Sequence, residues 1–405
     1  MLGFRKSNGA FGNMLKRFDG VLKQFRSATP ARARTSLIAI DRLFETEEFG
    51  SNPGQLRMFS YMPPPTIGQL PLVVVLHGCG QTAAGYDHGA GWSTLADRYG
   101  FAVLVPEQQR SNNPNGCFNW FQPEDATRGS GEAASIHQMV QAMARDHGID
   151  PRRVFITGLS AGGAMTSVML ACYPETFAAG AIIAGLPYGA ASNVQQAFQS
   201  MFQCPQRLAK DWGDRVRAAA GRHKGSWPRI SVWHGGADKT VIPTNALEIV
   251  KQWTDVHGLA AVPSKEDRVA GFPRQAWLND AGEELVETYT IPNMSHGTPL
   301  ATGDGEVECG AAGPFLLDVG ISSTFHIARF FGLTLHGPRP VSAASRLNHP
   351  AANHHPLPFQ AEPLHGEARD DAPAQRFRKE LGRDRIDISA VILRALEQAG
   401  LKSRG

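Results

Sequence analysis

Ten residues near the middle of the chain, VFITGLSAGG from Val154 to Gly163, constrain the fold more than any other segment. An apolar, β-branched run ends in Gly-x-Ser-x-Gly and continues directly into the helical sequence AMTSVML. This order predicts a strand, a tight turn and a helix, with Ser160 on the bend and Gly158 and Gly162 giving the backbone clearance. The Ser160 hydroxyl would then lie at a helix N-terminus, where developing negative charge is favoured. We interpret the segment as a nucleophile elbow, with a glycine-rich turn and an idle serine as the alternative.

Strands and helices are expected to alternate on both sides of this segment. The run PLVVVL at 71–76 is almost continuously apolar, which is typical of a strand buried on both faces. Further short apolar runs predict strands at Phe101–Pro106, Phe177–Ala184 and Ile230–His234. Helical spacing predicts helices at Gly91–Arg98, Gly131–His147 and Ala246–His257. The predicted fold class is α/β, with a mostly parallel, doubly wound sheet covered by helices on both faces, as in α/β-hydrolases.

Other segments are expected at the margins of this sheet. An edge hairpin is predicted from Ser36–Leu43 and Gln55–Tyr61, with the acidic, glycine-containing stretch Glu45–Gly54 as its turn region. A second hairpin, Arg274–Leu278 with Leu285–Ile291, is predicted around the turn sequence NDAG. Residues 190–228 have no strand pattern and are expected to form a helical insertion over the sheet, and a helix near Ser323–Phe331 closes the domain.

Composition changes divide the chain into four predicted parts. Residues 1–35 form a basic amphipathic arm, since residues 1–34 hold eight Lys and Arg against the single acid Asp19. Residues 36–335 form the catalytic domain, 336–380 a Pro- and His-rich linker, and 381–405 a C-terminal helix. The arm either docks on its own domain or is disordered, or it adsorbs to an anionic or apolar surface.

The global composition excludes several classes of protein. A net charge of +3 and a pI near 8.6 give no general electrostatic attraction for nucleic acid. No apolar run reaches the 18 residues of a transmembrane helix candidate, and Lys16 and Arg17 interrupt any secretory apolar region. On these residues alone we expect a cytoplasmic protein.

Five cysteines are too few and too scattered for a metal site or a disulfide-dense scaffold. Cys172 follows the elbow on its helix and is expected to be a small buried residue. The other four lie in loops and could form two bridges in an oxidising compartment, with pairing that spacing does not assign. A bridge between Cys79 and Cys117 would lock a loop beside the elbow.

A serine hydroxyl needs a histidine to take its proton and a carboxylate to orient that histidine. Asp238 follows the predicted strand Ile230–His234, and His296 follows Leu285–Ile291. Because carboxyl ends of parallel strands collect at one sheet edge, both side chains are expected beside Ser160. The order Ser, Asp, His is also that of α/β-hydrolases. We therefore predict Ser160, Asp238 and His296 as a catalytic triad.

Rival residues fit this pattern less well. His77 precedes the serine, and His234 lies inside the turn that carries Asp238, so we expect both to brace loops. The rival acids Asp211, Asp214 and Asp255 fall on predicted helices. An Asx-type turn remains the structural alternative for Asp238.

An oxyanion formed at Ser160 would need two backbone N–H donors. One comes from the residue after the nucleophile, Ala161, and the second from the loop HGCG that follows the run 71–76. We predict Cys79 as this second donor, with Gly80 as the fallback.

The stretch NNPNGCFNWFQ, residues 112–122, is a polar loop with aromatic residues. Trp120 and Phe121 would contact an apolar substrate chain or, equally well, anchor the loop to its own domain.

Four motifs in order, LHGCGQ from Leu76, CFNWF from Cys117, GLSAGGAM from Gly158 and HGGADKTV from His234, carry a family resemblance. They resemble the esterase family of polyhydroxybutyrate depolymerases, specifically the short-chain polyhydroxyalkanoate depolymerase catalytic domain, and are similar to feruloyl and acetylxylan esterases. The resemblance covers roughly residues 37–333. It implies an α/β-hydrolase fold, the triad and oxyanion loop above, and cofactor-free hydrolysis of ester bonds between 3-hydroxyacid units.

The expected activity is therefore serine carboxylic-ester hydrolysis on poly(3-hydroxybutyrate) or its oligomers. An esterase for feruloyl or acetylxylan esters is the alternative, and an inactive protein that binds polymer granules through the basic arm is a rival of another class. The resemblance implies secretion, which conflicts with the missing signal peptide, and the tail beyond Arg346 is too short for the substrate-binding domain that secreted depolymerases often carry.

Overall fold

The computed structural model describes residues 42–64, 68–335 and 337–338. The chain divides into two units, Met1–Ser342 and Ala343–Gly405, and everything described below belongs to the first. The predicted basic arm, almost all of the predicted linker and the predicted C-terminal helix lie outside the described residues.

The core of the described unit is a ten-stranded sheet in the order β1-β2-β4-β3-β5-β6-β7-β10-β9-β8. From β4 to β10 all neighbouring strands are parallel, and both margins are antiparallel. The predicted mostly parallel sheet is confirmed. The bounds are β1 Phe44–Thr46, β2 Arg57–Tyr61, β3 Leu70–Leu76, β4 Ala102–Glu107, β5 Ile149–Leu159, β6 Ala179–Ile183, β7 Arg229–Gly235, β8 Lys265–Val269, β9 Phe272–Leu278 and β10 Glu284–Ile291.

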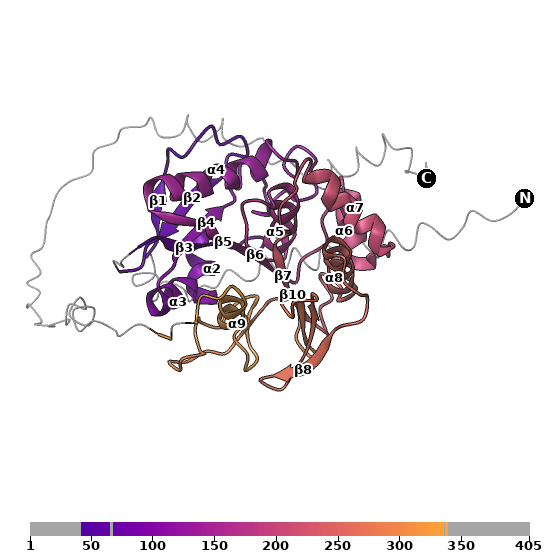
Figure 1. The fold of residues 1–405 in the computed structure, drawn as a ribbon. Helices are drawn as coiled ribbons and strands as arrows, with labels where there is room; N and C mark the ends of the chain where they lie inside the picture. The colour runs from indigo at the N-terminus through magenta and orange to yellow at the C-terminus, as the bar shows by residue number, and fades with distance from the viewer. Residues whose placement is uncertain (1–41, 65–67, 336, 339–405) are drawn as a thin grey trace, which may run out of the picture. The chain divides into compact units, whose positions relative to one another are not determined.

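Helices cover both faces of this sheet (Figure 1). Alternate residues of β3 enter different cores: Leu72, Val74 and Leu76 belong to one hydrophobic cluster, and Val73 and Val75 to the other. The first cluster includes α4 Gly131–Asp146, α5 Ala161–Cys172, α7 Ala209–Ala219 and α8 Thr244–His257, and the second includes α2 Ala83–Ala90, α3 Trp92–Tyr99 and α9 Ser323–Phe330. This two-sided burial explains why the central strands are continuously apolar.

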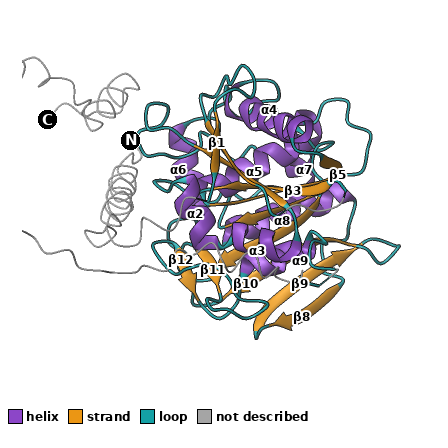
Figure 2. Ribbon diagram, turned by 90° about the vertical axis from the view of Figure 1, so that its left-hand side faces the viewer, coloured by secondary structure: helices purple, strands orange, loops and turns teal. Residues whose placement is uncertain are grey.

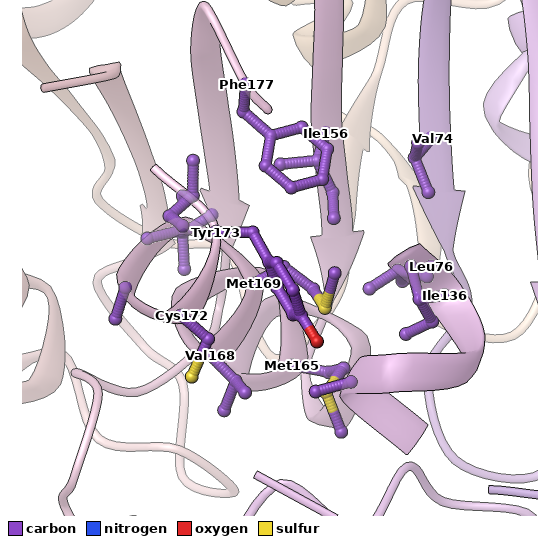
Figure 3. Packing of buried hydrophobic residues seen from close by; sticks show 14 of the residues in the cluster. Val74, Leu76, Ile136, Ile156, Met165, Val168, Met169, Cys172, Tyr173 and Phe177 are labelled. Carbon is purple, nitrogen blue, oxygen red and sulfur yellow. The ribbon is translucent and has the colours of Figure 1, made fainter. Parts of the chain in front are cut away.

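Helix α5 is the centre of the first cluster, and all of its residues are buried. Met165, Val168 and Met169 project from α5 among strand side chains such as Ile156 and Val74 (Figure 3). Burying each such side chain stabilises the fold by about 1.5–3 kcal/mol, which makes α5 a rigid support for the residue that precedes it.

The predicted helical insertion at 190–228 is confirmed as α6 Val194–Gln203 and α7. The predicted hairpin around NDAG is also confirmed, as β9 and β10, and β8 extends it to a three-stranded antiparallel margin (Figure 2). Strand β8, KEDRV, is polar and about half exposed, so it has no apolar alternation that would have revealed it.

Two expectations near the N-terminal side of the domain need comment. The predicted first strand of the edge hairpin, Ser36–Leu43, lies outside the described residues except for positions 42 and 43, and the strand that pairs with β2 is Phe44–Thr46, which overlaps the stretch predicted as the turn. Helix α2 was not predicted, because its sequence AAGYDHGA contains two glycines. Its N-cap Thr82 accepts from the Gly85 N–H, and a Cβ at Gly89 would lie 2.1 Å from Leu316 Cδ1, so the Leu316 side chain packs directly against this glycine.

Candidate active site

Ser160 lies on a strained bend between β5 and α5. Its φ of 58° and ψ of −116° are rare for a non-glycine residue, and strain of this kind concentrates at functional sites. Its N–H donates to the Ile183 carbonyl at 2.9 Å. A Cβ at Gly158 would lie 2.4 Å from the Gly162 oxygen, and one at Gly162 would lie 2.3 Å from the Leu76 oxygen. Both glycines therefore allow the close approach that the sequence pattern predicts.

Asp238 and His296 follow β7 and β10 and form a buried pair. The Nδ1 of His296 is hydrogen-bonded to Oδ2 of Asp238 at 2.7 Å. The other oxygen, Oδ1, accepts the N–H groups of Thr240 at 2.8 Å and Val241 at 2.9 Å. Burial on its own raises the pKa of Asp238, but His296 and His234 outweigh it and hold that pKa well below its ordinary value. Asp238 is therefore a carboxylate that orients an imidazole.

The loops that carry this pair are tied to each other through their backbones. The Gly236 N–H donates to Ile291 O at 2.8 Å, and the Ala237 N–H donates to Met294 O at 3.0 Å. A Cβ at Gly235 would lie 2.3 Å from the Met294 oxygen, so the acid turn approaches the histidine loop at a distance only glycine permits.

The second ring nitrogen of His296, Nε2, is buried and has no hydrogen-bond partner among the described residues. With Nδ1 bonded to a carboxylate, Nε2 is the nitrogen able to accept a proton. Ser160 lies at the carboxyl end of β5, the sheet edge to which β7 and β10 also deliver their loops. No hydrogen bond joins Ser160 to His296 in this part of the chain, and such contacts often tighten only with substrate bound.

The two rival histidines brace loops, as expected. His77 shares a hydrogen bond with the Gly78 carbonyl at 2.7 Å through Nδ1, and its Nε2 accepts the Gln108 N–H at 3.1 Å. Burial lowers the pKa of His77, which keeps it neutral. His234 contacts the Val241 carbonyl at 2.8 Å and also lies 3.4 Å from Oδ2 of Asp238, so it supports the acid directly.

The predicted oxyanion loop follows β3 and lies against the start of α5. Within the loop, the Gly78 N–H donates to Oε1 of Gln81 at 2.8 Å, and the Gly80 N–H donates to Gly116 O at 3.4 Å. None of the hydrogen bonds described for this domain uses the N–H of Cys79 or Ala161. Gly80, the fallback donor, is thus already engaged, which favours Cys79.

A disulfide joins Cys79 to Cys117, which is the bridge considered from the sequence for locking the loop beside the elbow. The expectation of a second bridge is wrong, because Cys172, Cys204 and Cys309 are free and buried. Cys204 terminates α6 in a left-handed conformation, and the Cys309 sulfur contacts Oγ of Ser322 at 3.3 Å. These two residues therefore fill separate interior positions.

The aromatic loop residues differ in their surroundings. Trp120 is only 8% exposed and belongs to the first hydrophobic cluster, which favours the anchoring interpretation for this residue. Phe121 is half-buried beside it, with the two rings edge-to-face at 5.5 Å.

A cleft of about 450 Å³ opens beside His296. Its apolar wall is formed by Pro314, Phe315 and Leu317, and its polar wall includes Lys239 and Thr240. The Phe315 ring lies edge-on to the His296 ring at 6.1 Å. This wall was not predicted from the sequence, and the apolar run PFLL at 314–317 was the available signal.

Across the described ranges, no group of three or more His, Cys, Asp or Glu side chains is arranged to hold a metal ion. The same residues contain no helix that is long and apolar enough to cross a bilayer.

A parallel sheet with a serine on a strained strand-to-helix bend, and an Asp–His pair delivered by later strands, defines an α/β-hydrolase. Comparison with known proteins narrows this class. The model of the family described as esterase PHB depolymerase matches residues 56–276, and the chain belongs to this family. It is a carboxylic ester hydrolase.

Similar proteins include a depolymerase and several esterases. The chain is 46% identical over 311 residues to poly(3-hydroxyalkanoate) depolymerase C of Paucimonas lemoignei, covering 77% of this chain and 75% of that one. It is 32% identical to feruloyl esterase B of Neurospora crassa over 307 residues, or 74% of this chain and 95% of that one. Among solved structures, acetyl xylan esterase from Aspergillus awamori matches with a TM-score of 0.60 and 26% identity, covering 72% of this chain and 99% of that chain.

Proposed function

We propose that the protein cleaves ester bonds of poly(3-hydroxybutyrate) or its oligomers through an acyl-enzyme on Ser160. The observation that carries the mechanism is the buried hydrogen bond of 2.7 Å between His296 Nδ1 and Asp238 Oδ2, at the sheet edge that also holds Ser160. The similarity to a poly(3-hydroxyalkanoate) depolymerase supports the choice of substrate.

In the acylation half-reaction, Oγ of Ser160 attacks the ester carbonyl while Nε2 of His296 takes its proton. Asp238 keeps the imidazole in the tautomer with a free Nε2 and stabilises the imidazolium that forms. The N–H groups of Cys79 and Ala161 stabilise the oxyanion of the tetrahedral intermediate, a contribution worth about 2.7–4 kcal/mol per donor. The imidazolium then protonates the leaving alcohol oxygen, and the acyl-enzyme remains.

In the deacylation half-reaction, His296 removes a proton from water, and the resulting hydroxide attacks the acyl carbonyl. Collapse of the second tetrahedral intermediate returns the proton to Ser160 Oγ and releases the hydroxyacid. The proposed residues perform every proton transfer, so the cycle requires no cofactor.

The cleft beside His296 suits a chain of short ester units. Its Pro314, Phe315 and Leu317 wall provides apolar surface for methyl-bearing acyl groups, and Phe121 is retained as a candidate contact on the loop after Cys117. Trp120, being buried, acts by supporting that loop. We also propose that the basic N-terminal arm attaches the enzyme to the surface of polymer granules.

Hydrolysis of feruloyl or acetylated polysaccharide esters is the second candidate. The specific observation in its favour is the similarity to acetyl xylan and feruloyl esterases, which extends over about three quarters of the chain. The same triad would perform this reaction, so only the substrate distinguishes the two functions.

A substrate panel tests these functions: amorphous poly(3-hydroxybutyrate), its soluble oligomers, p-nitrophenyl butyrate and methyl ferulate. We expect release of 3-hydroxybutyrate to exceed ferulate release by at least about tenfold in kcat/KM, a difference of about 1.4 kcal/mol in transition-state binding. Preference for methyl ferulate would select the second candidate. Failure of a fluorophosphonate to label the protein would leave only the inactive granule-binding alternative.

A further inference from the structure

Glu132 is a fully buried carboxyl group outside the triad. It is the second residue of α4, its side chain is inaccessible to solvent, and the 50–54 loop covers it so closely that a Cβ at Gly54 would lie 2.4 Å from Glu132 Cα. A buried carboxylate costs several kcal/mol unless its oxygens are hydrogen-bonded. Its partners therefore indicate what the group is for.

Three N–H donors converge on the two oxygens of Glu132. Oε1 accepts from Nε2 of Gln108 at 2.5 Å and from Nδ2 of Asn112 at 3.2 Å. Oε2 accepts the backbone N–H of Asn119 at 2.8 Å. Glu132 thus fixes both ends of the loop that carries Cys117.

Gln108 connects Glu132 to the predicted oxyanion loop by two routes. Its side-chain Nε2 also donates to the Cys117 carbonyl at 2.9 Å, and Cys117 is covalently bonded to Cys79. Its backbone N–H donates at 3.1 Å to Nε2 of His77, whose Nδ1 contacts Gly78 O. Gln108 follows β4, the parallel neighbour of β3, so this connection joins the ends of adjacent strands.

We propose that Glu132, acting through Gln108, is a positioning residue that holds the Cys79 N–H where it meets the oxyanion formed at Ser160. This inference rests on the proposed function, because it assigns a role only if Cys79 donates to a tetrahedral intermediate. An oxyanion donor must lie within about 2.7–3.1 Å of the developing charge. Two tethers to a rigid helix keep a glycine-flanked loop within that tolerance, since displacements near 1 Å are enough to reduce rates severely.

The test compares Glu132→Gln and Gln108→Ala with the full-length wild type. Both readouts below are taken at about pH 9, where Glu132 is a carboxylate even though burial raises its pKa to about 8. In Glu132→Gln one of its oxygens becomes an NH₂ group, which must face one of the three donors. Gln108→Ala removes the link and leaves the Asn119 contact of Glu132 in place, so it carries the test if Glu132→Gln does not fold. Ser135→Ala is the matched control, because Ser135 is buried on the same helix and its Oγ accepts the Gly54 N–H at 2.8 Å.

Two readouts separate positioning from general stability: kcat and KM for p-nitrophenyl butyrate, and the Kd of a boronic acid that forms a tetrahedral adduct on a nucleophilic serine. For Glu132→Gln and Gln108→Ala we expect kcat to fall about 10- to 100-fold, which is less than the effect of losing a whole oxyanion donor. The Kd for the boronic acid should rise by a similar factor, and KM should be nearly unchanged. The double variant should be little worse than either single variant, because both break one path. Ser135→Ala should retain kcat within about twofold.

Folded Glu132→Gln or Gln108→Ala protein with wild-type kcat and wild-type affinity for the boronic acid would overturn the inference. So would a loss confined to KM, or an equal loss of kcat in Ser135→Ala. These results are distinct from failure of the proposed function, in which the wild type itself would neither hydrolyse the ester nor bind the boronic acid.

Discussion

Ser160 occupies a backbone conformation that a serine adopts only when its surroundings impose it. Strain of this kind costs about 1–3 kcal/mol, and the buried helix α5 on one side and the hydrogen bond to Ile183 on the other hold the residue in place. The side chain is thereby presented at the sheet edge. The glycines on either side are required by contacts of their backbones and not by a positive φ, since neither has one.

Asp238→Asn tests the orientation of His296. An Asn amide that donates to Nδ1 would move the ring hydrogen to Nε2, which then cannot accept the Ser160 proton. We expect kcat for p-nitrophenyl butyrate to fall about 10⁴-fold, the loss known for this change in a Ser-His-Asp triad. Asp255→Asn is the control, since Asp255 pairs with Arg217 on α7, and it should leave kcat unchanged. Less than tenfold loss in Asp238→Asn would contradict the role.

Glu132 also predicts how stability depends on pH. Burial, followed by the charge of Asp125, raises the pKa of Glu132 to about 8, and its other close partners are uncharged amides. The folded protein therefore binds more protons than the unfolded chain between about pH 4.5 and pH 8, so this contribution to stability is present at low pH and lost as pH rises.

Urea unfolding across that window measures this contribution. The free energy of unfolding of the wild type minus that of Glu132→Gln is expected to fall as pH rises, because only the wild type carries the Glu132 contribution. Glu287, whose pKa burial raises to about 7, adds a similar slope in both proteins and so does not affect the comparison. Equal slopes for the two proteins would refute the assignment.

At the scale of residues, the sequence was sufficient where chemistry restricts residue type and order. Ser160, Asp238 and His296 could be proposed because each follows a strand, and the structure then shows the bond between the last two. Phe315 and Glu132 could not be found in this way. The run PFLL that contains Phe315 is apolar, but nothing in it indicates that this loop covers the sheet edge. The position of Glu132 depends on a fit between α4 and two distant loops, which has no local pattern.

At the scale of elements, the sheet holds its loops by covalent and polar links as well as by packing. The Cys79–Cys117 disulfide connects the loop after β3 to the loop after β4 across 38 positions. Because a bridge of this kind restricts the unfolded chain, it stabilises the folded state by about 2–4 kcal/mol.

Thiol counting and unfolding test this bridge. We expect three thiols to titrate in denatured, unreduced protein and all five after reduction. The double variant Cys79→Ser, Cys117→Ser should lower the free energy of unfolding by about 2–4 kcal/mol. The variant Cys204→Ser loses one free thiol, so about two thiols should titrate before reduction. Five titrating thiols before reduction would show that the bridge is absent.

The same scale explains which elements the sequence predicts. Buried parallel strands and the long helix α4 have strong apolar patterns, and each is found close to its predicted position. Helix α2 and strand β8 have weak patterns because tertiary contacts stabilise them: α2 packs Gly89 against Leu316, and β8 pairs with β9 through its backbone. Elements of this kind form only once the rest of the fold is in place, so their own sequences do not predict them.

At the scale of the whole molecule, the described domain is built on a ten-stranded sheet between two hydrophobic clusters, with every candidate catalytic residue at one edge of that sheet. The sheet places the candidate triad, whereas loops form the wall that contacts substrate. Relatives with the same fold can therefore act on different esters. The family could be predicted from four ordered motifs, and the ester cannot be derived from them.

The central claim is that Ser160 is the nucleophile, and the kcat of Ser160→Ala for p-nitrophenyl butyrate tests it most directly. The substitution removes only the hydroxyl, so folding measured by thermal unfolding should be preserved. We predict that kcat falls by at least about 10⁴-fold and that labelling by a fluorophosphonate is lost. A folded Ser160→Ala protein that hydrolyses the ester at the wild-type rate would contradict the account.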